Sequence, residues 1–327
     1  MTRTARRAMI RETGGPEAIA WEEVALPDPG PGEALVRHEA VGLNFIDTYF
    51  RSGLYPTALP SPLGGEGAGV VEAVGEGVTD VGVGDRVAYA TGGLGAYSTA
   101  RLIGAGHLVR LPEPVSFEDA AAVMLKGLTV QYLFRRTVHV GPETTVLFHA
   151  AAGGVGLIAC QWARSEGIRL IATAGSPEKC ALAVEHGAAE AIDYRREDVP
   201  ARVRALTGGR GADVVMDGVG RDTFLMSLDS LRPVGMLISF GNASGKVEPF
   251  DLQLLSQKGS LQLTRPTLFT HARDPGTLRS MAADLFGKVE SGAVKVRIDQ
   301  RFPLEQAAEA HQALESRATT GSTVLVP

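Results

Sequence analysis

Apolar and polar positions change their rhythm once along the chain, near residue 127. Before that point, short apolar stretches with partial alternation are separated by glycine-rich turns. Alternation with a period of two is typical of strands that are buried on one face. Short strands at regular spacing, punctuated by glycine, indicate a compact barrel. The strands predicted in this part lie at residues 33–41, 69–74 and 86–90.

After residue 127, short apolar runs alternate with segments of helical periodicity. This order predicts a doubly wound parallel sheet, in which every strand is followed by a helix. The predicted strands lie at 146–149, 170–174, 191–194, 213–216, 236–240 and, at an edge, 261–264. The predicted helices lie at 154–165, 177–186, 198–206 and near 222–231.

The tail beyond residue 266 has a mixed pattern, with helices predicted at 278–289 and 306–316 and a strand at 322–326. We expect this tail to return to the first domain and complete it. The predicted fold class is therefore α/β, with a β-barrel domain and a Rossmann-type domain. The predicted divisions are 1–126 for the barrel, 127–265 for the parallel sheet and 266–327 for the returning segment.

A glycine-rich turn joins the first strand of the parallel sheet to its helix within residues 145–164. Gly153, Gly154 and Gly156 follow a short apolar run, and helical periodicity begins directly afterwards. This is the context of a dinucleotide fingerprint, in which backbone and helix N-terminus meet a pyrophosphate. Ala151 stands where the first glycine of G-x-G-x-x-G is expected. The turn residues are therefore candidate cofactor contacts: Ala152, Gly153, Gly154 and Val155.

Charge and cysteine content narrow the possible classes of partner and compartment. The 327 residues carry a formal net charge of -5, which argues against a broad basic face for nucleic acid. The two cysteines, Cys160 and Cys180, fall inside predicted helices and form neither a disulfide framework nor a metal cluster. No long apolar run follows the basic N-terminus, so we expect no signal peptide and no membrane helix, and a cytoplasmic location.

Several motifs together resemble the zinc-free quinone oxidoreductase branch of the medium-chain dehydrogenase/reductase superfamily. They are residues 151–156 (AAGGVG), 65–70 (GEGAGV), 84–87 (GDRV), 44–49 (NFIDTY) and 51–55 (RSGLY). The resemblance covers essentially the whole chain. It implies a GroES-like catalytic domain, a Rossmann domain and a cleft between them.

The chain departs from the zinc-dependent branch of that superfamily at the positions of the metal ligands. Asn44 stands about where that branch has a catalytic cysteine, Gly65 stands where it has a histidine, and the region near Leu125 offers no further cysteine. Asn44 and Gly65 cannot replace those ligands. We therefore expect no metal.

The end of the second predicted strand of the sheet lacks the acidic residue that an NAD site usually places there. Gly175 and Ser176 follow this strand instead, and Lys179 comes one turn later. Ser176 can donate to a phosphate and Lys179 can supply the opposite charge. The resemblance adds Tyr194, at the end of the third strand. These residues predict NADPH as the cofactor.

Further cofactor contacts are implied by the resemblance and by the ends of the later strands. Arg265 can make either a direct cofactor contact or an interdomain salt bridge, and Arg317 is a weaker candidate for the phosphates. The remaining candidates are Asn44, Lys126, Thr129, Gly218, Phe240 and Gly241.

The resemblance implies hydride transfer from NADPH to a small quinone, with the final proton drawn from water. The candidate catalytic residues are Asn44, Asp47, Tyr49 and Tyr55. Tyr55 is expected to line the substrate pocket, and Asn44 to hold the nicotinamide or donate to the substrate oxygen. Asp47 is either catalytic or a structural residue that orients the neighbouring main chain.

Two other functions stay open at this point. One is reduction of an activated C=C bond in an enone or enoyl thioester, and the other is an RNA-binding or lens-protein-like structural role. The resemblance also implies a homodimer in which the last strands of two parallel sheets pair edge to edge. The apolar alternation of residues 259–264 fits such an edge.

Overall fold

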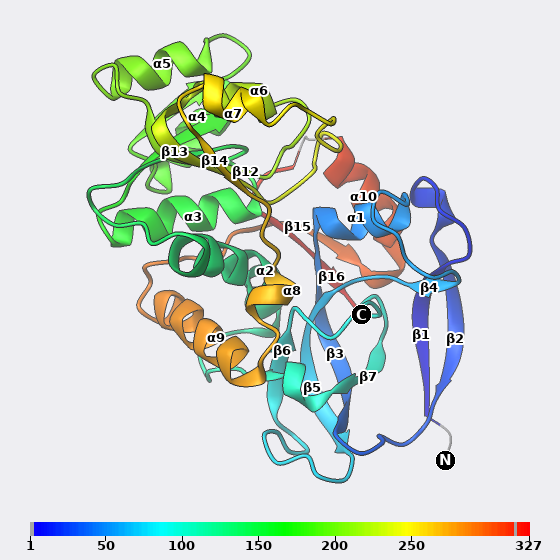
Figure 1. Ribbon diagram of the computed structural model, residues 1–327. Coiled ribbons are helices and arrows are strands. Elements are labelled where there is room, and N and C mark those ends of the chain that lie inside the picture. Colours follow the sequence, from blue (N-terminus) through cyan, green and yellow to red (C-terminus); the bar gives the residue numbers. More distant parts are fainter. Residues whose placement is uncertain (1–2, 317–318) are drawn as a thin grey trace. The chain divides into compact units, whose positions relative to one another are not determined.

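The computed structural model describes residues 3–316 and 319–327 and divides the chain into two units (Figure 1). Unit 1 comprises Met1–Leu128, Ala272–Glu290 and Val296–Pro327, and unit 2 comprises Thr129–His271 and Ser291–Lys295. The boundary at Leu128 falls within helix α2 (Phe117–Tyr132). Within the described residues, no helix is both long enough and apolar enough to cross a membrane.

Unit 2 is built on a six-stranded sheet in which every neighbouring pair of strands is parallel. The strand order is β11-β10-β9-β12-β13-β14. In chain order this reads 3-2-1-4-5-6, the usual order of a dinucleotide-binding sheet. The strands are β9 (Thr145–Phe148), β10 (Arg169–Ala174), β11 (Glu190–Asp193), β12 (Ala212–Asp217), β13 (Leu231–Ser239) and β14 (Gln262–Thr264).

Each strand of unit 2 is followed by a helix; the periodicity predicts the first four of these helices but not the last two, which have five and four residues. The helices are α3 (Gly154–Ser165), α4 (Pro177–Glu185), α5 (Val199–Leu206), α6 (Phe224–Asp229), α7 (Gln253–Gln257) and α8 (Leu268–His271). Helices α3 and α4 pack against β10. The central strand β9 is buried along its whole length, which explains why its sequence is apolar without alternation.

Unit 1 contains two sheets. One is three-stranded, in the order β2-β1-β4, and the other runs β15-β16-β3-β5-β6-β8, with β7 also paired to β3. The strands are β1 (Arg3–Ile10), β2 (Ala20–Leu26), β3 (Glu33–Leu43), β4 (Ser61–Pro62), β5 (Glu66–Val74), β6 (Arg86–Tyr89), β7 (Ala100–Gly104), β8 (Val109–Arg110), β15 (Ile298–Pro303) and β16 (Ser322–Val326).

The C-terminal segment adds strands to the sheet that begins near the N-terminus. Strand β16 pairs antiparallel with β3, through Thr323–Leu43 and its neighbours, and parallel with β15. Three helices besides α2 belong to unit 1: α1 (Phe45–Arg51), α9 (Pro275–Glu290) and α10 (Ala307–Glu315). The core of unit 1 gathers side chains from both sheets and from α10.

Candidate functional site

A buried polar cluster in unit 1 surrounds the carboxylate of Glu66, at the start of β5. The Asn44 amide nitrogen donates to Glu66 Oε2 over 2.7 Å, and the Leu125 backbone N–H donates to Oε1 over 2.6 Å. The Lys126 ammonium lies 3.5 Å from Oε2 and 3.3 Å from the Leu43 carbonyl oxygen. We call Asn44, Glu66 and Lys126 the Glu66 cluster. All three side chains are buried.

The local backbone makes room for this carboxylate. A Cβ atom on Gly42 of β3 would lie 2.1 Å from Glu66 Oε2 and 2.2 Å from the Ala121 carbonyl oxygen. No side chain larger than hydrogen fits at Gly42 while Glu66 stays in place. Burial raises the pKa of Glu66, and the Lys126 ammonium and the Asn44 amide oppose that rise because they favour the charged form.

The Glu66 cluster fixes the orientation of the Asn44 side chain. A carboxylate only accepts hydrogen bonds, so the amide must turn its NH2 group toward Glu66. The Asn44 side chain also accepts from the Asp47 backbone N–H in the capping box of α1. The amide nitrogen has a second N–H besides the one directed at Glu66. Both roles predicted for Asn44, holding the cofactor's nicotinamide and donating to a substrate oxygen, therefore stay proposals.

A second buried network leads away from Asp47, which lies in the first turn of α1. Asp47 Oδ2 accepts from the Asn44 backbone N–H over 2.9 Å and from the Tyr97 hydroxyl over 3.0 Å. Tyr97 contacts His311 Nε2 at 3.0 Å, and His311 Nδ1 lies 3.1 Å from Arg51 Nη1. We call Asp47, Tyr97, His311 and Arg51 the Asp47 network.

The hydrogen bonds of the Asp47 network have only one consistent direction. The Arg51 guanidinium can only donate, so His311 Nδ1 accepts and Nε2 carries the proton. His311 then donates to Tyr97, and Tyr97 donates to Asp47. Burial, helped by Arg51, lowers the pKa of His311 to about 3, so the ring is neutral. Because His311 Nδ1 accepts from Arg51, which keeps its protons, the Asp47 network offers no path for a proton. Its hydrogen bonds hold Asp47 in place.

Asp47 itself is fully buried and one of its oxygens, Oδ1, has no hydrogen-bond partner among the described residues. Burial raises the pKa of Asp47 to about 7. The contacts of Asp47 are to the start of α1 and to Tyr97, which supports its structural role over the catalytic one.

The two candidate tyrosines lie next to each other. Their ring centroids are 5.1 Å apart, and the Tyr55 N–H donates to the Tyr49 carbonyl oxygen over 3.0 Å. Tyr49 is buried, whereas Tyr55 is only partly buried. The structure therefore brings the segments 44–49 and 51–55 together as the sequence suggests, with Tyr55 on the more accessible side.

In unit 2 the glycine-rich turn after β9 leads into α3, as predicted. The N-cap residue is Gly153, and no side chain caps the helix. By contrast, the first turns of α4 and α5 are capped by Ser176 and Asp198. The first N–H groups of α3 therefore remain available to an anion. A Cβ on Gly156 would lie 2.4 Å from the Ala151 Cα, so the turn needs glycine there, whereas Ala151 is accommodated in place of the expected glycine.

The polar residues predicted to bind the 2′-phosphate lie at the ends of β10 and β11. Lys179 is partly buried, and burial together with Arg195 lowers its pKa. Tyr194 lies over Gly175, where an added Cβ would come within 2.5 Å of the tyrosine hydroxyl. Ser176 accepts from the Lys179 backbone N–H over 3.3 Å, and its hydroxyl bonds the exposed Glu178 carboxylate, which lowers the pKa of Glu178. A phosphate would have to compete with Glu178 for Ser176.

The ends of β12 and β13 lie close together. A Cβ on Gly241 would lie 2.3 Å from the Gly218 carbonyl oxygen, and one on Gly218 would lie 2.9 Å from the Phe240 ring. Arg265 donates to the Gly241 carbonyl oxygen over 3.0 Å and to Ser239 Oγ over 3.2 Å. Arg265 therefore supports the strand ends of its own unit. Thr129 is buried at the start of unit 2, and Arg317 lies outside the described residues.

The residues of unit 1 do not suit a zinc ion. Among residues 3–316 and 319–327, no three or more histidine, cysteine, aspartate or glutamate side chains gather as a metal site would require. Near Glu66, the Lys126 ammonium would repel a metal cation. Cys160 and Cys180 are unpaired thiols on α3 and α4 of unit 2.

Three members of the Asp47 network were not predicted from the sequence as site residues: Arg51, Tyr97 and His311. Nothing in the sequence links residues so far apart in the chain. Glu66 carries a clearer signal, because it directly precedes a glycine-rich apolar run and a buried acid needs partners.

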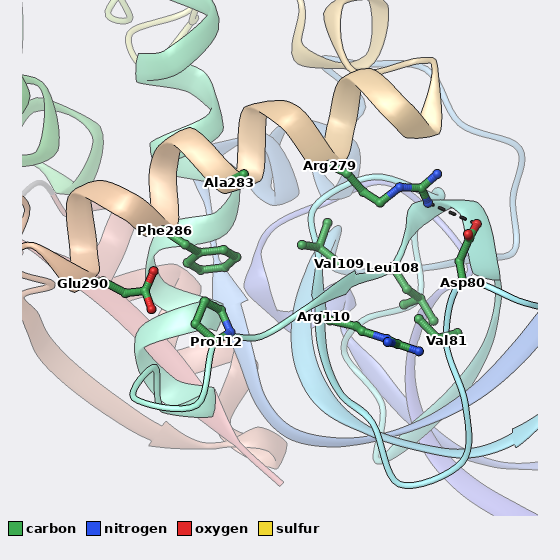
Figure 2. A pocket seen from close by; sticks show the side chains of 10 residues that line it. All are labelled: Asp80, Val81, Leu108, Val109, Arg110, Pro112, Arg279, Ala283, Phe286 and Glu290. Carbon is green, nitrogen blue, oxygen red and sulfur yellow. Dashed lines mark hydrogen bonds and ion pairs between the residues drawn. The ribbon is translucent and has the colours of Figure 1, made fainter.

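Unit 1 also has a hollow that shares no residue with the Glu66 cluster (Figure 2). It has a volume of about 380 Å³ and lies beside α9 and β8. Phe286, Val109 and Leu108 supply apolar side chains, and Arg279 forms an ion pair with Asp80 over 3.2 Å across its rim.

Comparison with known proteins gives matches over both parts of the chain. Residues 30–113 match the alcohol dehydrogenase GroES-like domain, and residues 154–281 match the zinc-binding dehydrogenase family. The chain is 56% identical to a quinone oxidoreductase of Pseudomonas aeruginosa, over 99% of this chain and 100% of that protein. It is 42% identical to a 2-haloacrylate reductase of Burkholderia, over 98% of each.

Among solved structures, the quinone oxidoreductase of Escherichia coli complexed with NADPH has a TM-score of 0.97 to this chain. The two are 49% identical, and the match covers 98% of this chain and 100% of the other. The predicted fold class, a GroES-like domain with a Rossmann-type domain, is confirmed.

Proposed function

This chain belongs to the quinone oxidoreductase family of the medium-chain dehydrogenase/reductase superfamily, and we propose that it reduces small quinones with NADPH, without zinc. The nicotinamide supplies the hydride. The protein therefore has to bind the cofactor and the substrate, orient them toward each other and exclude water. The family relatives named as quinone oxidoreductases, one of them complexed with NADPH, support this reading.

The observation that carries the proposal is the end of β10. The end of this strand, residues 172–176, has no acid to accept the ribose 2′-hydroxyl of NAD. Instead Ser176 and Lys179 open α4, and Tyr194 closes over Gly175. A lysine and a hydroxyl suit a 2′-phosphate. The uncapped first turn of α3 suits the pyrophosphate.

We assign the substrate pocket to Tyr49 and Tyr55, and we assign contact with the cofactor's nicotinamide to the Asn44 side chain. The remaining predicted contacts keep their roles as proposals: Thr129, Ala152, Gly153, Gly154, Val155, Gly218, Phe240, Gly241 and Arg265.

The deciding experiment follows NADPH consumption with 1,4-benzoquinone in the presence of a strong metal chelator, beside NADH and beside a crotonyl thioester as rival acceptor. We expect rapid turnover of the quinone with NADPH only. Chelator-sensitive turnover would contradict zinc independence, and equal use of NADH would contradict the phosphate site.

Reduction of an activated C=C bond is the second candidate, and one observation favours it. A 2-haloacrylate reductase is 42% identical over nearly the whole chain. Faster turnover of 2-chloroacrylate or the thioester than of benzoquinone would move the substrate assignment to that class.

We also propose a homodimer and a cytoplasmic location. Strand β14 is an edge strand of the parallel sheet, and an exposed edge readily pairs with another chain. Two unpaired thiols are typical of proteins from a reducing compartment.

A further inference from the structure

The Lys126 ammonium is a buried charge whose contribution to stability is small. Its side chain is 7% exposed, and that of its partner Glu66 is 0% exposed. Removing two charges from water costs several kcal/mol per ion, and their attraction often recovers no more than this cost. The 3.5 Å separation is also long for an ion pair. Replacing a buried ion pair by an apolar pair is often neutral or stabilising, so the charge kept at this position points to a chemical role.

The Glu66 carboxylate places this ammonium beside Asn44. The Asn44 amide nitrogen and Lys126 Nζ both contact the same oxygen, Oε2, while Oε1 is held by the Leu125 N–H. Glu66 therefore positions one neutral and one charged side chain next to each other. The segment that carries Asn44 is also the segment that carries both candidate tyrosines.

The ammonium has donor capacity beyond the contacts that hold it. It has three N–H groups. Among the described residues its nitrogen contacts two acceptors, the Leu43 carbonyl oxygen at 3.3 Å and Glu66 at 3.5 Å. Both contacts are long for a charged donor, which normally bonds at about 2.7–2.9 Å. A substrate oxygen can therefore take the third N–H.

We propose that Lys126 is a catalytic residue that contacts a quinone oxygen, stabilises the negative charge that develops there and donates the final proton. This inference rests on the proposed function, and it assigns to Lys126 a role that the sequence analysis gave to water. Glu66 is then a positioning residue.

The step balances with the reagents that the proposed reaction contains. The quinone gains a hydride, with its electron pair, from NADPH, which becomes NADP⁺, and the product is the hydroquinone monoanion. One N–H bond of Lys126 then breaks as an O–H bond forms, and the hydroquinone leaves. The neutral Lys126 amine takes a proton from water before the next turnover.

An ammonium suits this task better than a tyrosine hydroxyl. Hydrogen bonds with a charged partner are about twice as strong as neutral ones. Removing one donor to a developing oxyanion typically lowers kcat by about 10²–10³. Lys126 is therefore expected to dominate over Tyr49 and Tyr55 in stabilising charge, leaving the rings to define the pocket.

The first test compares Lys126→Met with Lys295→Met, a matched change at an exposed lysine of unit 2. The acceptors are 2-methyl- and 2-chloro-1,4-benzoquinone, which have similar size but opposite electronic effects. We expect kcat/KM of Lys126→Met to fall by about 10²–10³, more for the methyl quinone because its oxyanion is more basic. The Kd for NADPH should change less than twofold.

Two results would overturn the assignment. One is unchanged kcat/KM for both quinones. The other is an equal loss for both quinones together with weakened NADPH binding, which would make Lys126 a cofactor contact. Absence of quinone turnover in the unmodified protein would instead contradict the proposed function.

A second test measures binding without turnover, and it includes a double variant so that misfolding of the single variant cannot be mistaken for loss of a contact. In Lys126→Met/Glu66→Gln no buried charge is left without its partner. Each NADP⁺-loaded protein is titrated with 4-nitrophenol, whose anion is coloured. We expect the unmodified protein to bind the anion and lower its apparent pKa, and both the single and the double variant to lose this shift. The same shift in all three proteins would exclude contact between Lys126 and a ligand oxyanion.

Discussion

Lys179 is the residue on which the choice between NADPH and NADH should depend. A hydrogen bond to a charged group contributes about 1.5–3 kcal/mol. Lys179→Ala should therefore weaken NADPH binding by roughly ten- to over a hundred-fold. NADH lacks the 2′-phosphate, so its binding should hardly change. Fluorescence titration of both nucleotides measures the two Kd values.

The matched control for this prediction is Lys246→Ala, at an exposed lysine of the same unit. It should leave both nucleotides bound as before. An equal loss of NADPH and NADH in Lys179→Ala would mean that the variant disturbs α4 rather than a phosphate contact.

Asp47 should make the stability of unit 1 depend on pH. Its pKa rises from 3.8 to about 7 on folding because the carboxyl is buried. Below about pH 4 the group is protonated in both states and contributes nothing. As the pH rises to 7, the unfolded chain loses the proton while the folded chain keeps it, so stability falls. At about 1.4 kcal/mol per pKa unit, the loss above pH 7 approaches roughly 4 kcal/mol.

Asp47→Asn tests whether stability falls as the pH rises. Asn keeps an oxygen that can accept from Tyr97 and from the Asn44 N–H, but it does not titrate. The free energy of unfolding of the variant, minus that of the unmodified protein, should rise by a few kcal/mol between pH 4.5 and pH 8. Urea unfolding at several pH values gives both quantities. A difference that stays constant with pH would show that Asp47 is ionised in the folded protein throughout this range.

At the level of elements, Arg51 joins the end of α1 to α10. It is buried and donates to Glu315 through Nη1 at 3.0 Å and Nη2 at 2.7 Å, to the Gly14 carbonyl oxygen and to His311. Arg51→Leu leaves His311 and the Gly14 carbonyl without their donor. Leaving a buried acceptor without its donor costs about 1–3 kcal/mol for each acceptor. Glu315→Gln should cost only about 1 kcal/mol, because this side chain is partly exposed and still accepts one bond.

Urea unfolding of the two variants measures this order. If Glu315→Gln were as damaging as Arg51→Leu, the ion pair itself, and not the buried donors of Arg51, would carry the stabilisation.

The elements of the parallel sheet could be predicted, and several of those in unit 1 could not. In unit 2 the apolar runs of β9 and β10 and the glycines that follow α3, α4 and α5 are local signals, each contained in a short stretch of sequence. Strands β1 and β2 pair over an intervening segment that contains no tight hairpin turn. Helix α2 was also not predicted, because most of its residues are buried and it lacks a polar face.

In the candidate site too, some contacts could be predicted from local sequence and others could not. Ser176 and Lys179, which we propose to bind the phosphate, follow one another closely after β10, and the lack of an acid at the end of this strand could be read from the sequence. The contact of Asn44 and Lys126 with Glu66 depends on three segments that meet only in the fold. The sequence suggested Lys126 from the resemblance alone, and its ion pair gives a physical reason to change its assigned role from cofactor contact to catalysis.

For the whole molecule, the open question is how the edge strand β14 is protected. It pairs with β13 on one side and has no further strand neighbour among the described residues. Proteins protect such edges with charge, bulges or a partner. The strand, Gln262–Thr264, contains no charged residue and no proline. A second copy of the chain is the simplest cover for it.

Lysines along this edge should therefore separate the proposed dimer. Gln262→Lys/Thr264→Lys places two like charges opposite their copies, which destabilises direct strand pairing. Light scattering during size-exclusion chromatography should give the mass of two chains for the unmodified protein and of one chain for the variant. Lys substitutions at the exposed Leu225 of α6 and Val184 of α4 provide the control, since they add the same charge away from the edge. A variant that keeps the mass of two chains would place the interface elsewhere.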